Sequence, residues 1–242
     1  MDLSIIIPAY NESTRIVSTL DSIVDFLSQR QWKWEIIVVD DGGQDGTAQL
    51  VDQYGSGHPG VRVLRNERNR GKGYSVRRGV SVATGAVVGF IDADDKTDIR
   101  ATDLVMELLG VDHGEDDGRA DIVIGDRTLP DSQIVVPRRS YREWGSRQFS
   151  RLLLRLVGLT GFADTQCGFK FFRKDVAALL FASQRTEGYM FDVEIILRGQ
   201  ASQYRIEHVP VRWTDDADSR FNPISGMIRN LRELARIRRD LR

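Results

Sequence analysis

The stretch GFIDADDKTD at residues 89–98 carries four aspartates directly after an apolar run. Asp92 and Asp94 are separated by one residue, so on a strand their side chains point to the same side. Neighbouring carboxylates repel each other unless a cation neutralises them. Mg²⁺ prefers few carboxylates together with phosphate oxygens, so this spacing indicates a divalent metal beside a diphosphate. The simpler interpretation is an acidic loop in which Asp94 or Asp95 caps a helix near Ala101.

A second pair of carboxylates follows another apolar run, in VVDDGGQDGT at residues 38–47. In the ordinary interpretation a glycine-rich turn leads into a helix that Asp45 caps. That interpretation leaves Asp40 and Asp41 unexplained. The glycine spacing is not GxGxxG, and the next strand ends near Arg65, where a dinucleotide fold would have an acid. We therefore expect at least one of Asp40 and Asp41 to contact a ligand other than a dinucleotide.

The elements that must position these acids are apolar runs separated by helical patterns. We expect strands at 4–7, 35–41, 61–65, 86–92 and 120–125, and helices at 16–27, 46–54 and 73–84. Continuous apolar strands that alternate with helices predict an α/β fold with a mainly parallel sheet covered by helices on both faces. In such a sheet, ligands bind at the carboxyl ends of the strands. The two acidic groups should therefore converge there.

The second half of the chain is less regular. Amphipathic helices are expected at Tyr141–Gly158 and Asn222–Arg239, a further helix at Val176–Phe181, and a strand at 204–213. The segment at 188–199 has the pattern of a core helix, although Asp192 and Glu194 within it need partners if buried. No repeat or low-complexity linker divides the chain, which predicts one domain.

Composition excludes some classes of protein. The 242 residues have a net charge of −1, whereas a protein dominated by nucleic-acid phosphate contacts is usually more basic, so no nucleic acid is expected as partner. The lone Cys167 cannot form an intramolecular disulfide and is expected to be packed. Neither a signal peptide nor an apolar run of roughly 18 residues is present. We expect a cytoplasmic protein, with membrane contact limited to the peripheral cytoplasmic face.

A series of motifs resembles one known family. In chain order they are IIIPAYNE, EIIVVDDGGQDGT, NRGKGYSVRRG, GFIDADD, RADIVIGDR, DTQCGFKFF, FDVEI and VPVRW. Together, over roughly residues 3 to 240, they resemble the inverting GT-A-fold glycosyltransferases of family 2. Within that family they are most similar to the enzymes that make dolichyl- or polyprenyl-phosphate sugars, especially the glucosyl branch.

This resemblance implies a metal-dependent hexosyltransferase with a GT-A fold, a Rossmann-like sheet flanked by helices on both faces. One domain would span 1–242, with a nucleotide-sugar-binding half at 1–126 and an acceptor-binding half at 127–242. The acceptor would be a polyprenyl phosphate. UDP-glucose is the favoured donor and GDP-mannose the alternative, with Mg²⁺ or Mn²⁺ as cofactor.

The resemblance also implies site residues, motif by motif. The donor would contact Pro8, Tyr10, Glu12, Asp40, Asp41, Lys72, Asp92 and Ala93. The metal would be bound by Asp92 and Asp94. Asp164 and Arg127 would be catalytic, with Asp164 near the reacting carbon of the sugar. The acceptor phosphate would be bound by Arg127, Arg139 and Arg212.

Two positions depart from the family pattern. Gly43 replaces the serine of the usual DDGS motif. Lys96 stands where the family often has Gln, Ser or Thr, and its ammonium cannot be a metal ligand because it has no lone pair. We expect Lys96 to pair with Asp95 or Asp98, or these acids to cap the next helix.

The acceptor determines whether the reaction needs a base. A phosphate monoester has a second pKa near ~6 and is already an ionised nucleophile at neutral pH, so its main requirement is arginine to hold it beside a diphosphate. A hydroxyl acceptor on a soluble molecule or glycan, the alternative, requires a base. Arginines are frequent in both expected amphipathic helices; these helices either meet anionic headgroups or are ordinary solvated surfaces.

Two other classes are less consistent with the sequence. A nucleotidyltransferase would normally have a glycine-rich basic loop after the first strand, where this chain has PAYNEST. A binding module that has kept the fold but lost activity would not hydrolyse a nucleotide sugar, which makes metal-dependent hydrolysis a direct test.

Overall fold

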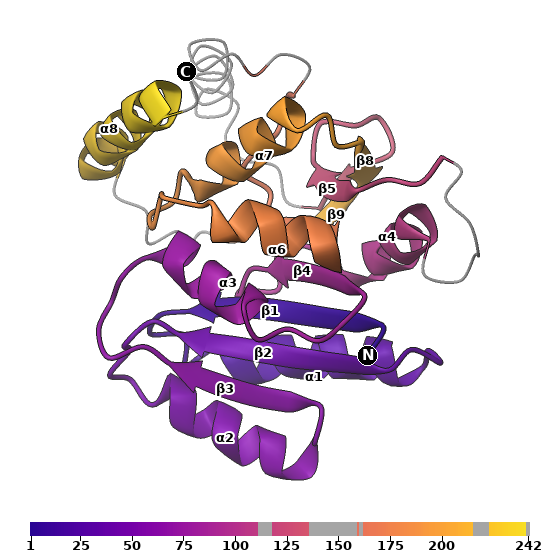
Figure 1. Ribbon diagram of the computed structural model, residues 1–242. Helices are drawn as coiled ribbons and strands as arrows, with labels where there is room; N and C mark the ends of the chain where they lie inside the picture. The colour runs from indigo at the N-terminus through magenta and orange to yellow at the C-terminus, as the bar shows by residue number, and fades with distance from the viewer. Residues whose placement is uncertain (111–117, 136–158, 160–161, 215–222, 241–242) are drawn as a thin grey trace.

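The computed structural model describes residues 1–110, 118–135, 159, 162–214 and 223–240. Its centre is a seven-stranded sheet in the order β3-β2-β1-β4-β7-β5-β8 (Figure 1). The strands are β1 (Leu3–Ala9), β2 (Trp34–Asp40), β3 (Val61–Arg65), β4 (Val87–Ile91), β5 (Ile122–Asp126), β7 (Phe169–Arg173) and β8 (Ile206–Pro210). A second, two-stranded sheet pairs β6 (Gln133–Ile134) with β9 (Arg212–Trp213).

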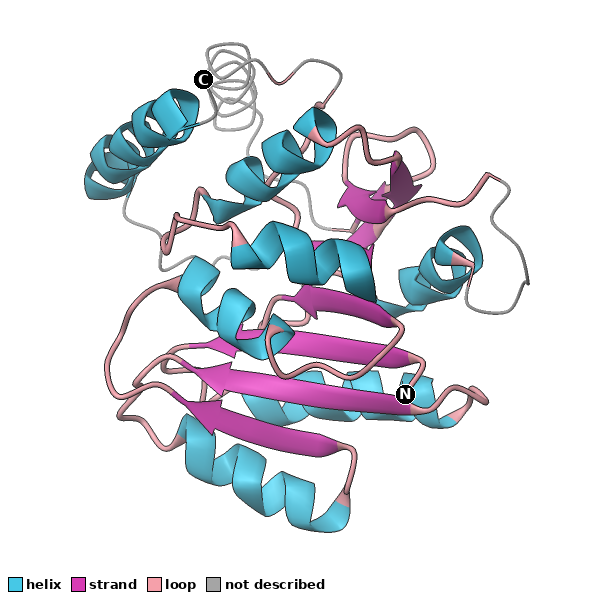
Figure 2. Ribbon diagram, viewed as in Figure 1, coloured by secondary structure: helices cyan, strands magenta, loops and turns pink. Residues whose placement is uncertain are grey.

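The large sheet is mainly parallel, as expected. Strand β1 pairs in parallel with β2 and β4, β2 with β3, and β5 with β8. Strand β7 is inserted between β4 and β5 and is antiparallel to both. Because β1, β2 and β4 are parallel neighbours, their carboxyl ends meet at one edge, where Figure 2 shows the loops that follow β1 and β2.

Helices cover both faces of the sheet. One face is covered by α1 (Ile16–Ser28), α2 (Thr47–Gly57) and α4 (Thr102–Leu109), and the other by α3 (Lys72–Val80), α6 (Lys174–Ala182) and α7 (Phe191–Ala201). Helix α8 (Pro223–Asp240) joins the core on this second side through Leu234 and Ile237. Successive residues of a strand point to opposite faces. In β1, Ile5 and Ile7 accordingly join the first core and Ile6 joins the second.

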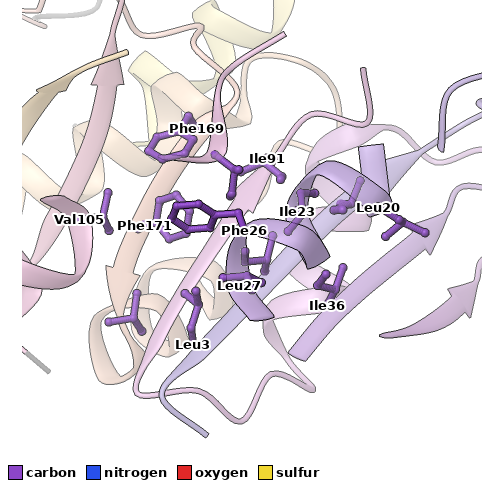
Figure 3. Close-up of a cluster of buried hydrophobic side chains, with 14 of the residues drawn as sticks. Leu3, Leu20, Ile23, Phe26, Leu27, Ile36, Ile91, Val105, Phe169 and Phe171 are labelled. Atoms are coloured by element: carbon purple, nitrogen blue, oxygen red, sulfur yellow. The ribbon is translucent and has the colours of Figure 1, made fainter. Parts of the chain in front are cut away.

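The core beneath α1 shows why its sequence is helical. Leu20, Ile23 and Leu27 recur at helical spacing and are fully buried against the sheet (Figure 3). Phe169 and Phe171 of β7 belong to the same cluster. Truncating one such side chain to alanine typically costs about 2–5 kcal/mol of stability. This core holds β1, β4 and β7 in the positions from which the site is built.

Several element boundaries differ from those expected. Pro8 does not stop the first strand. The pairing of β1 with β4 already ends at Ile6, so no hydrogen bond to β4 is lost because proline lacks an N–H. The helix expected at 73–84 ends at Val80. The strand expected at 204–213 is divided between β8 and β9, which belong to different sheets.

The later helices are confirmed where they are described. The helix expected at Asn222–Arg239 is α8, that at Val176–Phe181 lies within α6, and the core helix is α7. The helix expected at Tyr141–Gly158 lies outside the described residues. Within the described part of the chain, none of the helices combines the length and the apolar character needed to cross a membrane.

Candidate active site

A cavity of about 910 Å³ opens at the carboxyl ends of β1, β2 and β4. Its walls come from the loops after these strands, the start of α3, the segment before α7, and α8. It brings together nearly all of the residues expected to bind donor and metal: Pro8, Tyr10, Glu12, Asp41, Lys72, Asp92, Ala93 and Asp94. The expected convergence of the two acidic groups is thus confirmed, although they come from distant parts of the sequence.

Asp41, rather than Asp40, lines the cavity. Its Oδ1 accepts hydrogen bonds from Asn66 Nδ2 at 2.7 Å and from the backbone N–H of Arg70 at 3.0 Å. Its Oδ2 accepts from the N–H of Gly71 at 2.7 Å. This carboxylate therefore fixes the loop that leads into α3 and presents the first residue of that helix, Lys72, to the cavity.

Asp40 has a local structural contact instead. It is buried, its Oδ1 accepts from the N–H of Gly43 at 3.3 Å, and burial raises its pKa. A Cβ at Gly43 would lie 2.8 Å from that oxygen, so glycine at this departure from the DDGS pattern leaves room for the carboxylate. Asp45 lies just before the helix cap Gly46, and its Oδ1 accepts from the N–H of Thr47 at 3.0 Å.

Lys72 and Asp92 form an ion pair in the cavity wall. The distance from Lys72 Nζ to Asp92 Oδ1 is 2.6 Å, and the ammonium lies 5.8 Å from the centre of the Phe90 ring. Burial opposes ionisation of Asp92, but the adjacent Lys72 outweighs it, and the pKa of Asp92 lies below its ordinary value. Both groups are therefore charged at neutral pH.

Asp94 is paired with Lys96. Lys96 Nζ lies 3.3 Å from Asp94 Oδ2, and the backbone N–H of Lys96 donates to Asp94 Oδ1 at 3.4 Å. The expectation that Lys96 would pair with Asp95 or Asp98 was wrong, because the turn after Asp94 folds the lysine back onto it. Burial, and then the charge of Asp92, raise the pKa of Asp94. A cation that approaches Asp94 would lower this pKa again.

The two remaining acids of this stretch, Asp95 and Asp98, shape the local backbone. Asp98 caps the short 3₁₀ helix η1 (Ile99–Ala101) by accepting from the N–H of Arg100, as the capping alternative predicted. Asp95 has a φ of 52°, a backbone conformation that aspartate adopts more readily than most residues. Neither side chain contributes to the metal-binding pair.

The carboxylates fit a divalent cation that takes its other ligands from a diphosphate. Among the described residues, no group of three His, Cys, Asp or Glu side chains forms a complete metal cage. Mg²⁺, however, is usually held by one or two carboxylates plus phosphate oxygens and water. Asp92 and Asp94 supply two such carboxylates on one wall of the cavity.

Arg127 and Asp164 form a bidentate pair. Arg127 Nε donates to Asp164 Oδ2 at 2.6 Å, and Nη2 donates to Oδ1 at 2.8 Å. Burial opposes ionisation of Asp164, but the bonds from Arg127 dominate and hold its pKa below the ordinary value. The guanidinium lies 5.2 Å from the centre of the Trp213 ring and near enough to Asp92 for the two charges to interact. Asp164 is thus a poor proton acceptor and a strong anchor for Arg127.

A second, wholly buried pair lies behind Asp92. Lys170 Nζ is 2.9 Å from Asp192 Oδ1 and donates to the carbonyl oxygen of Cys167 at 2.6 Å. The side chains of Lys170 and Asp192 are 1% and 3% exposed. Sequence reasoning missed Lys170, because a single lysine in an apolar strand gives no signal of its partner. The charge of Lys170 also favours the ionised form of Asp92.

Glu194 is the other acid of the core helix that needed a partner. It is 2.8 Å from Arg198, one turn along α7, and accepts from the backbone N–H groups of Arg185 and Thr186. Both acids of the core helix therefore have the partners that their burial requires, an arginine on the same helix for Glu194 and a lysine of β7 for Asp192. Cys167 is packed as expected, and burial raises the pKa of its thiol to about 11.

Two of the arginines expected at the acceptor phosphate are not placed beside Arg127. Arg139 lies outside the described residues. Arg212 is exposed and lines a separate cavity of about 510 Å³ together with Asp98. Successive side chains of a strand point to opposite sides, and the side chain of the next residue, Trp213, is the one that lies beside Arg127. Of the two described arginines, Arg127 interacts electrostatically with Asp92 of the donor cavity, although its own side chain is not among the lining residues.

The donor cavity also contains residues that sequence reasoning did not select. Among them are Arg15, Arg70, Tyr189, Glu233 and Arg236. Glu233 of α8 accepts from the backbone N–H of Met190 at 3.1 Å, and Leu234 and Ile237 bury the same helix against the core. Helix α8 thus forms part of the wall, a contact that no local pattern in its sequence predicts.

Comparison with known proteins identifies the family. The model for "Glycosyl transferase family 2" matches residues 4–180. The dolichyl-phosphate beta-glucosyltransferase of Dictyostelium discoideum is 35% identical over 98% of this chain and 73% of its own length. The protein of the same name from Saccharomyces cerevisiae is 30% identical over 98% of this chain and 74% of its own length.

Solved structures resemble the fold. Glucosyl-3-phosphoglycerate synthase from Mycobacterium tuberculosis, in complex with Mn²⁺ and UDP-glucose, superimposes with a TM-score of 0.69 at 20% identity, over 98% of this chain and 78% of that one. Mannosyl-3-phosphoglycerate synthase from Rubrobacter xylanophilus gives 0.68 at 21% identity, over 99% and 74%. At this identity the likeness establishes the GT-A fold alone, which confirms the fold expected from the motifs.

Proposed function

The chain belongs to glycosyl transferase family 2, and we propose that it transfers glucose, with inversion, from a nucleoside diphosphate glucose to dolichyl or another polyprenyl phosphate. The observation that carries this proposal is Arg127, which is held by both oxygens of Asp164 and interacts electrostatically with Asp92 of the cavity wall, although neither Arg127 nor Asp164 is among the lining residues. The names of relatives that align over almost the whole chain support both the sugar and the acceptor.

The donor occupies the cavity at the strand ends. Asp92 and Asp94 would hold Mg²⁺ or Mn²⁺, and the bound ion would supply positive charge to neutralise the leaving diphosphate. Lys72 keeps Asp92 ionised, and Asp41 holds the loop that positions Lys72. Structures with UDP and Mn²⁺ among the similar folds make UDP-glucose the favoured donor, and GDP-mannose is the competitor to test.

The acceptor enters as an anion that needs no deprotonation. A phosphate oxygen attacks the anomeric carbon while the bond from that carbon to the diphosphate breaks, and the diphosphate leaves with the electron pair. Because a phosphate monoester is largely dianionic at neutral pH, the enzyme has to overcome repulsion between two phosphate groups. The guanidinium fork of Arg127 supplies charge and directional donors for this purpose.

Asp164 orients Arg127 and does not remove a proton. Both carboxylate oxygens already accept bonds from the guanidinium, and the N–H of Gln166 donates to Oδ1 at 3.1 Å. Its lowered pKa makes it a weak base. A hydroxyl acceptor would need a base at this position, so the geometry favours a lipid phosphate over a soluble or glycan alcohol.

A polyprenyl acceptor would place the reaction at a membrane surface, and we propose that the protein lies peripherally on the cytoplasmic face, as expected from its sequence. On α8, Leu234 and Ile237 are buried while Arg232, Arg236, Arg238 and Arg239 are exposed. The apolar stripe of this part of α8 therefore belongs to the core, and any attraction to the bilayer comes from its arginines. Basic groups near an anionic surface contribute about 1 kcal/mol each.

The direct test is transfer of labelled glucose into a lipid fraction. Purified protein is incubated with dolichyl phosphate, Mn²⁺ and either UDP-[¹⁴C]glucose or GDP-[¹⁴C]mannose, and the product is extracted into organic solvent. We expect glucosyl lipid from UDP-glucose, loss of product with EDTA, and a product that mild acid releases as free sugar. Absence of labelled lipid from either donor, with labelled transfer to a soluble alcohol, would refute the proposal.

A further inference from the structure

Lys96 occupies a fixed position next to the metal-binding pair. Its carbonyl oxygen accepts from the N–H of Thr214 at 2.8 Å, and the adjacent Thr97 forms a β-bridge with Trp213. The turn that carries Lys96 is therefore fastened to β9 and to Thr214, which follows it, at the lysine itself and at the residue after it. The side chain is only 15% exposed and lines the donor cavity.

The lysine is directed at Asp94. The distance from Lys96 Nζ to Asp94 Oδ2 is 3.3 Å, and Asp94 is itself only 21% exposed. The two carboxylates expected to bind the metal thus each have a lysine partner, Lys72 with Asp92 and Lys96 with Asp94. A divalent ion that approaches Asp94 meets a positive charge already beside one of the oxygens it needs, and Lys96 cannot become a ligand because it has no lone pair.

A nucleoside diphosphate reverses this situation. Its negative oxygens attract both the metal ion and the ammonium of Lys96. The lysine therefore weakens binding of a metal ion without a diphosphate, but strengthens binding of the metal ion and diphosphate together. We propose that Lys96 is a donor-binding residue that holds Asp94 in the free enzyme, weakens binding of the metal alone, and contributes a second cation to the diphosphate. The inference rests on the proposed donor site and adds an ordered or concerted entry of metal and donor.

The expected effects have opposite signs for the two ligands. Two unit charges 4 Å apart interact in high dielectric strongly enough to change an affinity by about fivefold. Mn²⁺ and the diphosphate each carry more than one charge, so Lys96→Gln should bind Mn²⁺ alone at least about fivefold more tightly and metal-free UDP at least about fivefold more weakly. A merely structural role for Lys96 would weaken both ligands together, so the pair of signs separates the two explanations.

The experiment measures binding and not turnover. Mn²⁺ affinity is obtained from the electron paramagnetic resonance signal of free Mn²⁺, and UDP affinity from calorimetry in EDTA and again in Mn²⁺. Lys96→Arg, which keeps the charge, should behave as wild type in both assays. Lys33→Gln is the matched control, because Lys33 is an exposed lysine at the amino end of β2, away from the cavity.

Each outcome decides the inference. Tighter Mn²⁺ binding with weaker metal-free UDP binding in Lys96→Gln alone supports it. Three outcomes overturn the inference and leave the donor site intact. They are an unchanged affinity of Lys96→Gln for metal-free UDP, UDP binding to the wild type that is seen only with Mn²⁺, and weaker binding of both ligands in Lys96→Gln. A wild-type protein that binds no UDP even with Mn²⁺ refutes the proposed donor site itself, and with it this inference.

Discussion

The pair of Arg127 and Asp164 gives the sharpest test of how the acceptor is activated. Two variants separate the possibilities: Arg127→Ala removes the phosphate-binding fork, and Asp164→Asn removes the only carboxylate that contacts that fork among the described residues. If the acceptor is a phosphate, the arginine carries the reaction and the aspartate only orients it. If the acceptor is an alcohol, the aspartate is the base and its loss is the more damaging.

The expected magnitudes follow from the contacts. A hydrogen bond to a charged group is worth about 1.5–3 kcal/mol, and Arg127 offers an acceptor phosphate more than one donor, so Arg127→Ala should lower kcat/KM by about 10²–10³-fold. Asparagine keeps the shape of Asp164 and one acceptor oxygen toward the guanidinium. Asp164→Asn should therefore cost only about tenfold, whereas loss of a general base costs about 10²–10⁴-fold.

The assay is lipid glucosylation at saturating donor, from pH 5.5 to 9, with UDP affinity measured in parallel. Arg127→Lys serves as the intermediate variant, because it keeps the charge but not the planar fork. Circular dichroism excludes misfolding, which matters because Asp164 is buried and loses its partner in Arg127→Ala. A loss beyond about 10³-fold in Asp164→Asn, with intact UDP binding and a lost acidic limb in the pH profile, would refute our assignment.

Three further predictions concern the metal, the core and pH. Asp94→Asn should lower activity at least about 10²-fold and raise the Mn²⁺ concentration needed for half-maximal rate, since it removes a metal-binding carboxylate; unchanged Mn²⁺ dependence would contradict this role. Lys170→Met should cost about 3–5 kcal/mol in urea unfolding by leaving buried Asp192 unpaired, with partial recovery in the double variant Lys170→Met/Asp192→Leu; an additive double variant would argue against the pairing. For Glu35, burial opposes ionisation, but bonds from Thr84 and Ser4 lower its pKa, so its stabilisation is present above its unfolded pKa and lost as pH falls through the folded value. The stability difference between wild type and Glu35→Gln should shrink below about pH 4.5, and a difference that is the same at pH 7 and pH 3 would contradict it.

Much of the donor site was predictable because its signals are local. Apolar runs ending in Asp41 and in Asp92 reveal strand ends directly, and parallel pairing brings strand ends to one edge whatever the exact order. The choice between Asp40 and Asp41 was not local. Asp40 is the last paired residue of β2, opposite Ala9 and Arg65, and the next residue is the one that leaves the ladder and reaches the cavity.

The partners of the charged residues were the least predictable feature. Lys96 has acids at positions 94, 95 and 98 within reach along the chain, and the fastened turn selects Asp94. Lys170 meets Asp192 only because β7 runs antiparallel between β4 and β5 and α7 packs over it. Glu233 reaches the cavity wall only because Leu234 and Ile237 dock α8 onto the core.

The sequence by itself determined the family, the mainly parallel α/β sheet, and the two acidic groups at its carboxyl edge, since each depends on short-range periodicity or on motif residues read in order. Tertiary structure decided the insertion of β7, the separation of Arg212 from Arg127, and the counter-ions of Asp92, Asp94 and Asp164. The physical reason is that a charge is neutralised by whichever opposite charge lies nearest in space. That distance is set by strand order and helix docking, which no local stretch of the sequence contains.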